Sequence, residues 1–306
     1  MKRNKCSLLP FIREDISSLS PNDSQFYGWE ITKFDIPSMW TKSKGEGVVV
    51  GIIDTGCDIN HPDIKNNLLG GINIIDKSKS PFDDNGHGTH VCGTVAAENN
   101  GIGMVGVAPK AKIHPIKALG ADGGGQNQHI AEGIVWAVDN GCDIIGMSLG
   151  CENEVLSIKK AIEYAVKHKV VIFCAAGNSG ESHKIMFPAQ NENTISIGAI
   201  DRNLNRTNFT CSGEELDFLC PGKDIVSCVP NNGYAMMSGT SMSTPFAIGC
   251  ACLLLSCNRK HSKESLDSAN DYINIFKKYS KPLADEKYRG SRKYEGYGIL
   301  YPVDCV

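Results

Sequence analysis

The stretch Gly47-Val48-Val49-Val50-Gly51-Ile52-Ile53 is a short, continuous run of mostly β-branched residues. Such a run fits a strand that is buried on both faces, as in a parallel sheet covered by helices. Four more runs of this kind follow, at 112–117, 142–147, 170–175 and 194–199. Helical patterns stand between them, at 87–97, 128–140 and 155–168. This alternation predicts an α/β fold with a largely parallel central β-sheet.

The bulk composition of the 306-residue chain excludes several classes of protein. A hydrophobic fraction of 41% is enough for a large core, and a net charge of -3 from mixed acidic and basic residues does not favour nucleic-acid binding. We expect no membrane span, because no 18-residue apolar run is evident, and no cleaved secretory signal. The 13 cysteines are odd in number and lack C-x-x-C pairs. We therefore expect small buried thiols in a reducing compartment.

Three polar residues stand at the ends of predicted strands or the start of a predicted helix. Asp54 directly follows 47–53, Asn178 follows 170–175, and His87 lies between glycines where a helical pattern begins. Sites in parallel sheets collect at the carboxyl ends of the strands. Each residue also has a plainer interpretation. Asp54 and Asn178 fit ordinary turns, and His87 fits either a turn or a metal pair with His90, although no further ligands stand nearby.

Ser241 lies in Gly239-Thr240-Ser241-Met242-Ser243-Thr244-Pro245, ahead of an apolar run of small residues. If a buried helix begins here, the unpaired N–H groups of its first turn would stabilise negative charge near the serine hydroxyl. A serine at such a place, taken alone, is more often a helix N-cap.

Taken together, the motifs around these residues resemble those of the subtilisin-like serine proteases. The order Asp54, His87, Ser241 is the subtilisin order of catalytic residues. The resemblance covers about residues 25–306 and rests on four motifs, Asp54-Thr55-Gly56, His87-Gly88-Thr89-His90-Val91, Ala175-Ala176-Gly177-Asn178 and Gly239 to Pro245. It implies a subtilisin-like three-layer fold, with helices on both faces of the sheet, and hydrolysis of peptide bonds through an acyl-enzyme. Ser241 would attack, His87 would move the proton, Asp54 would orient His87, and Asn178 would hold the oxyanion.

The resemblance also implies how a peptide or protein substrate would bind. Two backbone edges would pair with an extended substrate, one at Gly123, Gly124 and Gly125 and the other at Ser148, Leu149 and Gly150. Ala175, Ala176 and Gly177 would form part of the wall of the pocket next to the scissile bond. Phe246 and Asn127 depart from residues common in the family, so we transfer no cleavage preference.

A structural calcium site is a further implication of the resemblance. Asp63 and the stretch Glu98-Asn99-Asn100-Gly101-Ile102-Gly103-Met104 match the loop that holds Ca²⁺ in many subtilisins. Asp63 and Asn100 would bind through their side chains, and Glu98, Ile102 and Met104 through carbonyl oxygens. An all-oxygen set suits Ca²⁺, although a polar loop without a cation is the plainer interpretation.

Residues 1–24 are expected to form a short segment and linker ahead of a peptidase domain at 25–306. Leu8-Leu9-Pro10-Phe11 resembles the segment of intracellular subtilisins that lies across the active site of the zymogen and is removed on activation. A proline near the scissile position explains why such a segment inhibits without being cut, because its fixed φ and missing N–H spoil substrate-like pairing. The plainer interpretation is a disordered tail.

These features predict a cytoplasmic serine endopeptidase made as an autoinhibited zymogen, with its own N-terminal segment as inhibitor. A homodimer would be in keeping with the intracellular relatives. Two other functions fit the same motifs. One is a maturation protease dedicated to a single partner protein, and the other is a peptide-binding pseudoprotease, against which the presence of all four site residues argues.

Overall fold

The centre of the protein is a seven-stranded sheet in which all paired strands run parallel. The computed structural model describes residues 5–17, 19, 24–261 and 265–302. The strand order is β11-β10-β9-β7-β3-β5-β4. The strands are β3 (Val49–Asp54), β4 (Ile72–Asn73), β5 (Lys112–Lys117), β7 (Ile144–Met147), β9 (Val171–Ala175), β10 (Thr194–Ile200) and β11 (Phe218–Pro221). The expected α/β fold is confirmed.

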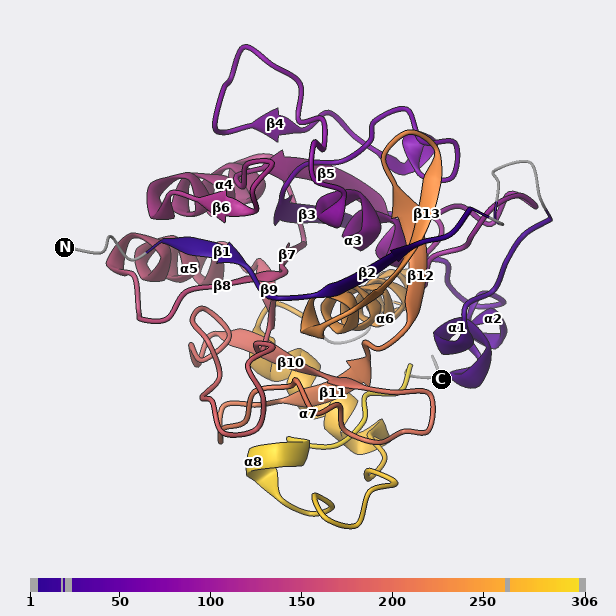
Figure 1. Cartoon of the computed structure of the whole chain (residues 1–306), viewed down its shortest axis with the longest axis vertical. Helices are drawn as coiled ribbons and strands as arrows, with labels where there is room; N and C mark the ends of the chain where they lie inside the picture. The colour runs from indigo at the N-terminus through magenta and orange to yellow at the C-terminus, as the bar shows by residue number, and fades with distance from the viewer. Residues whose placement is uncertain (1–4, 18, 20–23, 262–264, 303–306) are drawn as a thin grey trace.

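Two pairs of helices pack against this sheet. Helices α4 (Asn127–Asp139) and α5 (Leu156–Lys167) contact each other and strands β3, β5 and β9. Helices α3 (His87–Ala96) and α6 (Thr240–Lys260) form the second pair (Figure 1). Helix α3 contacts β3 and β5, and α6 contacts β7, β9, β10 and β11. The smaller helices are α1 (Trp29–Lys33), α2 (Ile36–Met39), the 3-10 turn η1 (Lys65–Asn67), α7 (Ala269–Tyr279) and α8 (Arg292–Glu295). Each strand and helix predicted from the sequence lies within two residues of an observed element.

Helix α6 departs from the expectation that the chain holds no membrane-length apolar stretch. It has 21 residues and is apolar enough, by length and composition alone, to cross a membrane. Its most apolar stretch is entirely buried within the protein, however, as in a core helix. The helix is therefore only weak evidence for a membrane span.

The N-terminal segment, residues 6–15, adds one strand to each of two small antiparallel sheets. Strand β1 (Cys6–Leu8) lies between β6 (Gly124–Gly125) and β8 (Leu149–Gly150). Strand β2 (Ile12–Asp15) pairs with β13 (Gly233–Ser238), whose other neighbour is β12 (Ile225–Val229). In Figure 1 the two indigo strands β1 and β2 follow one another across the face of the molecule. Most of the linker expected after it, at 17–24, lies outside the described residues.

The expectation of reduced thiols is wrong for three of the described cysteines, Cys6, Cys151 and Cys257, which are disulfide-bonded. Cys6 and Cys151 form a disulfide, with their Cα atoms 4.4 Å apart. Antiparallel pairing of β1 with β8 brings the two residues within the range that a disulfide spans, and this depends on contacts between distant parts of the chain. Nine other cysteines in the described residues are free and buried.

Candidate active site

Asp54 and His87 form a fully buried hydrogen-bonded pair. Asp54 is the last residue of β3 and His87 the first of α3. The Nδ1 atom of His87 lies 2.9 Å from Asp54 Oδ1 and 3.0 Å from Oδ2. An ionised carboxylate only accepts hydrogen bonds, so Nδ1 carries the proton and Nε2 is the basic nitrogen. The imidazole is thereby arranged to take up a proton at Nε2.

The loop before His87 is fixed by Asp83, a residue that the sequence analysis did not single out. Its carboxylate accepts hydrogen bonds from the N–H groups of Gly86 and Thr89 at 2.9 Å and from the hydroxyl of Thr55 at 2.8 Å. Burial opposes ionisation of Asp83, but these hydrogen bonds outweigh it and lower its pKa. Asp83 therefore anchors both the turn after β3 and the start of α3.

Gly88 permits the close approach of α3 to that turn. A Cβ added to Gly88 would lie 2.2 Å from the carbonyl oxygen of Gly56 and 3.2 Å from Asp54 Oδ1. Any larger residue would push the histidine away from its carboxylate. Gly88 thus has a packing role in the site.

His90 does not form a metal pair with His87. Its Nε2 atom lies 3.1 Å from the carbonyl oxygen of Ile225 and 3.2 Å from that of Ala235, so this nitrogen is a donor. Complete burial lowers the pKa of His90 to about 3, which keeps the ring neutral. His90 therefore ties α3 to β12 and β13.

Asn178 is oriented by the start of α6. Its Oδ1 atom accepts hydrogen bonds from the N–H and the hydroxyl of Thr240, at 2.9 and 2.8 Å. Because a backbone N–H can only donate, this contact fixes which end of the amide is oxygen. The Nδ2 atom points the other way and donates to the carbonyl oxygen of Pro10 at 2.7 Å. The amide thus holds a peptide carbonyl of the N-terminal segment.

Ser241 is the second residue of α6, and its hydroxyl bonds a backbone carbonyl and not the imidazole. It donates to the carbonyl oxygen of Ser148 at 3.2 Å, while the Ser148 hydroxyl donates to the carbonyl oxygen of Ser241 at 3.0 Å. Within the described residues, His87 Nε2 has no hydrogen-bond partner. The ring of Phe11 lies beside the imidazole, with centroids 5.0 Å apart. The expected nucleophile and base are therefore not joined by a hydrogen bond, and the base lies beside Phe11 of the segment.

The backbone edges expected to bind a substrate hold the N-terminal segment. Cys6 and Ser7 stand opposite Gly125 and Gly124 of β6, and the Leu8 N–H donates to the carbonyl oxygen of Gly123 at 2.9 Å. On the other side, β8 places Gly150 opposite Ser7 and Leu149 opposite Leu8. Strand β1 thus occupies both edges at once.

Leu9 fills a pocket beside the second edge, with an exposed fraction of 1%. A Cβ added to Gly150 would lie 2.6 Å from Leu9 Cδ2 and 3.1 Å from Met186 Cε. Met186 was not predicted from the sequence. It packs against Gly177, where an added Cβ would lie 3.0 Å from its Cγ atom, and its N–H donates to the carbonyl oxygen of Ala176. The expected wall at 175–177 therefore lies next to Met186.

The segment continues beyond Phe11 along the other half of the cleft. Ile12 stands opposite Ser238, and Asp15 stands opposite Ala235 in β13. Arg13 donates from Nη1 to the carbonyl oxygen of Asn85, at 3.2 Å, in the loop that precedes His87. The segment therefore runs past the three expected catalytic residues and is held by backbone pairing on both sides of them.

Three of the five expected calcium ligands converge on the side chain of Gln25. The Nε2 atom of Gln25 donates to three of the expected carbonyl oxygens, those of Glu98 at 3.1 Å, Ile102 at 2.8 Å and Met104 at 2.9 Å. Asn100 lies in the same loop, where its Oδ1 atom accepts from the Ile102 N–H at 3.2 Å. Three carbonyl oxygens thus point at one side-chain amide.

Asp63 lies against the same loop. Its Oδ2 atom accepts hydrogen bonds from the Met104 N–H and the Tyr234 hydroxyl, both at 2.8 Å. Its Oδ1 atom is buried and has no hydrogen-bond partner among the described residues. A buried carboxylate oxygen of this kind needs a donor or a cation.

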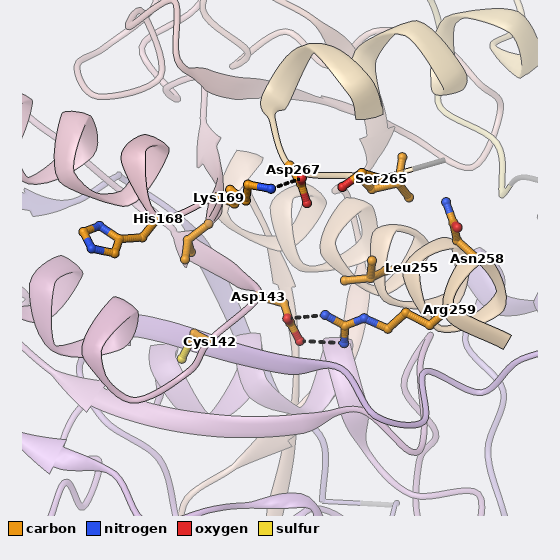
Figure 2. Close-up of a pocket in the computed structure, with 11 residues that line it drawn as sticks. Cys142, Asp143, His168, Lys169, Leu255, Asn258, Arg259, Ser265 and Asp267 are labelled. Carbon is orange, nitrogen blue, oxygen red and sulfur yellow. Dashed lines mark hydrogen bonds and ion pairs between the residues drawn. The ribbon is translucent and has the colours of Figure 1, made fainter. Parts of the chain in front are cut away.

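A second hollow lies at the opposite end of the central sheet. Its volume is about 320 Å³, and it is lined by residues that precede β7 and β9, among them Asp143 and Lys169 (Figure 2). Asp143 pairs with Arg259, and Lys169 with Asp267 at 2.7 Å. Since Asp54 ends β3 and Asn178 follows β9, both at the carboxyl ends of the strands, this hollow is separate from the site.

Comparison with known proteins agrees with this geometry. The model of the Subtilase family matches residues 45–289. The intracellular serine protease of Paenibacillus polymyxa is 39% identical over 273 residues, which are 87% of this chain and 82% of that protein. The major intracellular serine protease of Bacillus subtilis (strain 168) is 37% identical over 275 residues, 87% and 84% of the two chains. Subtilisin BL of Lederbergia lenta is 40% identical over 261 residues, 81% and 96%. The chain belongs to the subtilase family and is a serine endopeptidase.

Proposed function

We propose that this endopeptidase uses Asp54, His87 and Ser241 as its catalytic triad, and that residues 6–15 hold it inactive as a zymogen. The observation that carries the proposal is the 2.7 Å hydrogen bond from Asn178 Nδ2 to the carbonyl oxygen of Pro10. An oxyanion donor lies at this distance from the oxygen on which charge develops. The peptide bond in the reacting position is then Pro10–Phe11.

Each expected catalytic residue has a role that its contacts support. Rotation of the Ser241 side chain from the Ser148 carbonyl toward His87 Nε2 would give the nucleophile its base. His87 would take the proton as Ser241 attacks and return it to the leaving amine, while Asp54 stabilises the imidazolium. Asn178 and the N–H of Ser241, in the first turn of α6, would hold the oxyanion.

The segment occupies the cleft as a substrate would but resists cleavage for two reasons. Pro10 has no N–H, so it cannot continue the pairing that Leu8 makes with the β8 edge. The Ser148 carbonyl, beside that edge, accepts the Ser241 hydroxyl instead, which keeps the nucleophile away from its base. Phe11 covers the imidazole from the other side.

The names of two relatives place those proteins inside the cell. By analogy we propose a cytoplasmic location for this chain, with peptides or proteins as substrates. General protein degradation and the maturation of one partner protein would both use this catalytic chemistry.

Replacing the nucleophile tests the triad. In a shortened chain that starts at Ser24, Ser241→Ala should abolish labelling by a fluorophosphonate and lower kcat by about 10⁴-fold or more. The matched control is Ser243→Ala, because the Ser243 hydroxyl is buried in the same helix and has no hydrogen-bond partner among the described residues. The control should still be labelled. Labelling of the Ser241→Ala chain would contradict the assignment.

Removing the segment tests the zymogen. The chain that starts at Ser24 should hydrolyse a peptide substrate with an initial rate at least about tenfold above that of the full-length chain, because an attached inhibitor acts at a high effective concentration. Pro10→Ala in the full-length chain should shorten the lag before activity appears. The measurement is the initial rate, with mass spectrometry to show that no trimming has begun. Equal rates for untrimmed full-length and shortened chains would sink the idea.

We further propose that the loop at 98–104 binds a structural Ca²⁺, as subtilases generally do. The partnerless Oδ1 atom of Asp63 and the three converging carbonyl oxygens supply hard oxygen ligands, which Ca²⁺ prefers. The amide oxygen of Gln25 would add another ligand if its side chain turned over. The residues present therefore fit a calcium ion.

Chelation tests the calcium site. EDTA should lower the melting temperature of the shortened chain by roughly 5–10 °C, since loss of a ligand bound only to the folded state costs about 3 kcal/mol at saturating Ca²⁺. Asn100→Ala should weaken the effect, whereas Asn99→Ala, an exposed neighbour, should leave it intact. Calcium but not magnesium should restore the loss. A melting temperature that EDTA does not change would count against the site.

A further inference from the structure

The N-terminal segment is joined covalently to the wall of the substrate cleft. Cys6 belongs to β1, and Cys151 directly follows β8. Their disulfide links positions 145 residues apart in the sequence, and the two Cα atoms are 4.4 Å apart. The bond therefore fastens the proposed inhibitor to the strand that would pair with a substrate.

Backbone contacts hold both cysteines in place. The Cys6 N–H donates to Asn127 Oδ1 at 3.2 Å, and Cys6 stands opposite Gly125. The Cys151 N–H donates to the carbonyl oxygen of Phe187 at 2.7 Å, and its own carbonyl accepts from the Phe187 N–H at 3.2 Å. The exposed fractions of the two cysteines are 0% and 1%. The disulfide is thus part of the docked arrangement of β1.

We propose that this disulfide is a redox-controlled latch on the peptidase, an inference that rests on the proposed inhibitory role of residues 6–15. A cut after the segment separates it from the peptidase domain only if the disulfide is open. While the disulfide is closed, the severed peptide stays beside the cleft at a high effective concentration and binds again. Activity therefore requires both the cut and the reduction.

A dithiol reductant opens the latch by thiol–disulfide exchange. One of its thiolates attacks the sulfur of Cys6 or Cys151, the S–S bond breaks, and the other cysteine leaves as a thiolate that takes up a proton. The second thiol of the reductant then attacks the mixed disulfide and releases the remaining cysteine as a thiol. Both cysteines are reduced, the reductant is oxidised to its disulfide, and two protons have passed to the protein.

The disulfide latch predicts which redox conditions allow the peptidase to be active. Thiols stay reduced in a reducing compartment, so the segment leaves there once the chain is cut. Oxidising conditions keep the disulfide closed and the cleft filled. The enzyme would therefore be held inactive under oxidation even after its chain has been processed.

Cutting the chain at a defined site allows the effect of the disulfide to be measured separately from that of the processing cut. Residues 18–22 of the full-length chain are replaced by the recognition sequence of an unrelated endopeptidase, and the protein is purified without thiols. After the cut, non-reducing mass spectrometry should show the N-terminal peptide still attached, with slow hydrolysis of a peptide substrate. Dithiothreitol should release the peptide and raise the initial rate at least about tenfold.

The matched variant is Cys6→Ser in the same chain. After the cut it should be active without dithiothreitol, and dithiothreitol should change its rate little; Cys151→Ser should behave in the same way. The latch is overturned if the cut, oxidised parent is as active as the Cys6→Ser chain, or if dithiothreitol activates both equally. If none of the chains reacts with a fluorophosphonate after it has been both cut and reduced, the catalytic assignment itself fails. Full activity of the uncut Cys6→Ser chain would overturn the inhibitory role.

Discussion

Parallel pairing of β3, β7 and β9 is the constraint on which the site depends. Neighbouring parallel strands end at the same edge of a sheet, so Asp54, Ser148 and Asn178 meet there although they are far apart in the sequence. Helices α3 and α6 begin near the same edge and contribute His87 and Ser241. Because each of these residues lies at or just beyond the end of a strand, or in the first turn of a helix, the burial of the core also fixes how the site residues are placed.

The N-terminal segment is held mainly by backbone groups, and this explains how a short peptide can fill a site that accepts other sequences. The N–H and C=O groups of β6 and β8 are the same for any extended chain, so in the proposed role specificity would fall to the pocket that holds Leu9 beside Met186. What distinguishes the segment from a substrate is local. Pro10 removes one donor, and Phe11 lies on the imidazole.

The sequence predicts the central strands and helices well because hydrophobic periodicity is a local signal, and it predicts the four expected site residues through their motifs. It does not reveal Asp83 or Gln25, whose roles come from hydrogen bonds to backbone groups in other loops. The pairing of Cys6 with Cys151 depends on β1 lying beside β8, which no spacing of cysteines encodes. The direction of the Ser241 hydroxyl, toward the Ser148 carbonyl, is a rotamer choice that no sequence motif encodes.

The weakness of short strands explains why a covalent bond is useful at this position. Strand β1 has three residues and β2 has four, and ordering each residue costs about 1–2 kcal/mol of backbone entropy, so little net affinity remains for a free peptide of this length. In the intact chain, the connection to the peptidase domain supplies a high effective concentration. Once that connection is cut, the disulfide is the remaining covalent link between the segment and the cleft wall, and it lies next to the edge where, in the proposed role, the segment would compete with substrate.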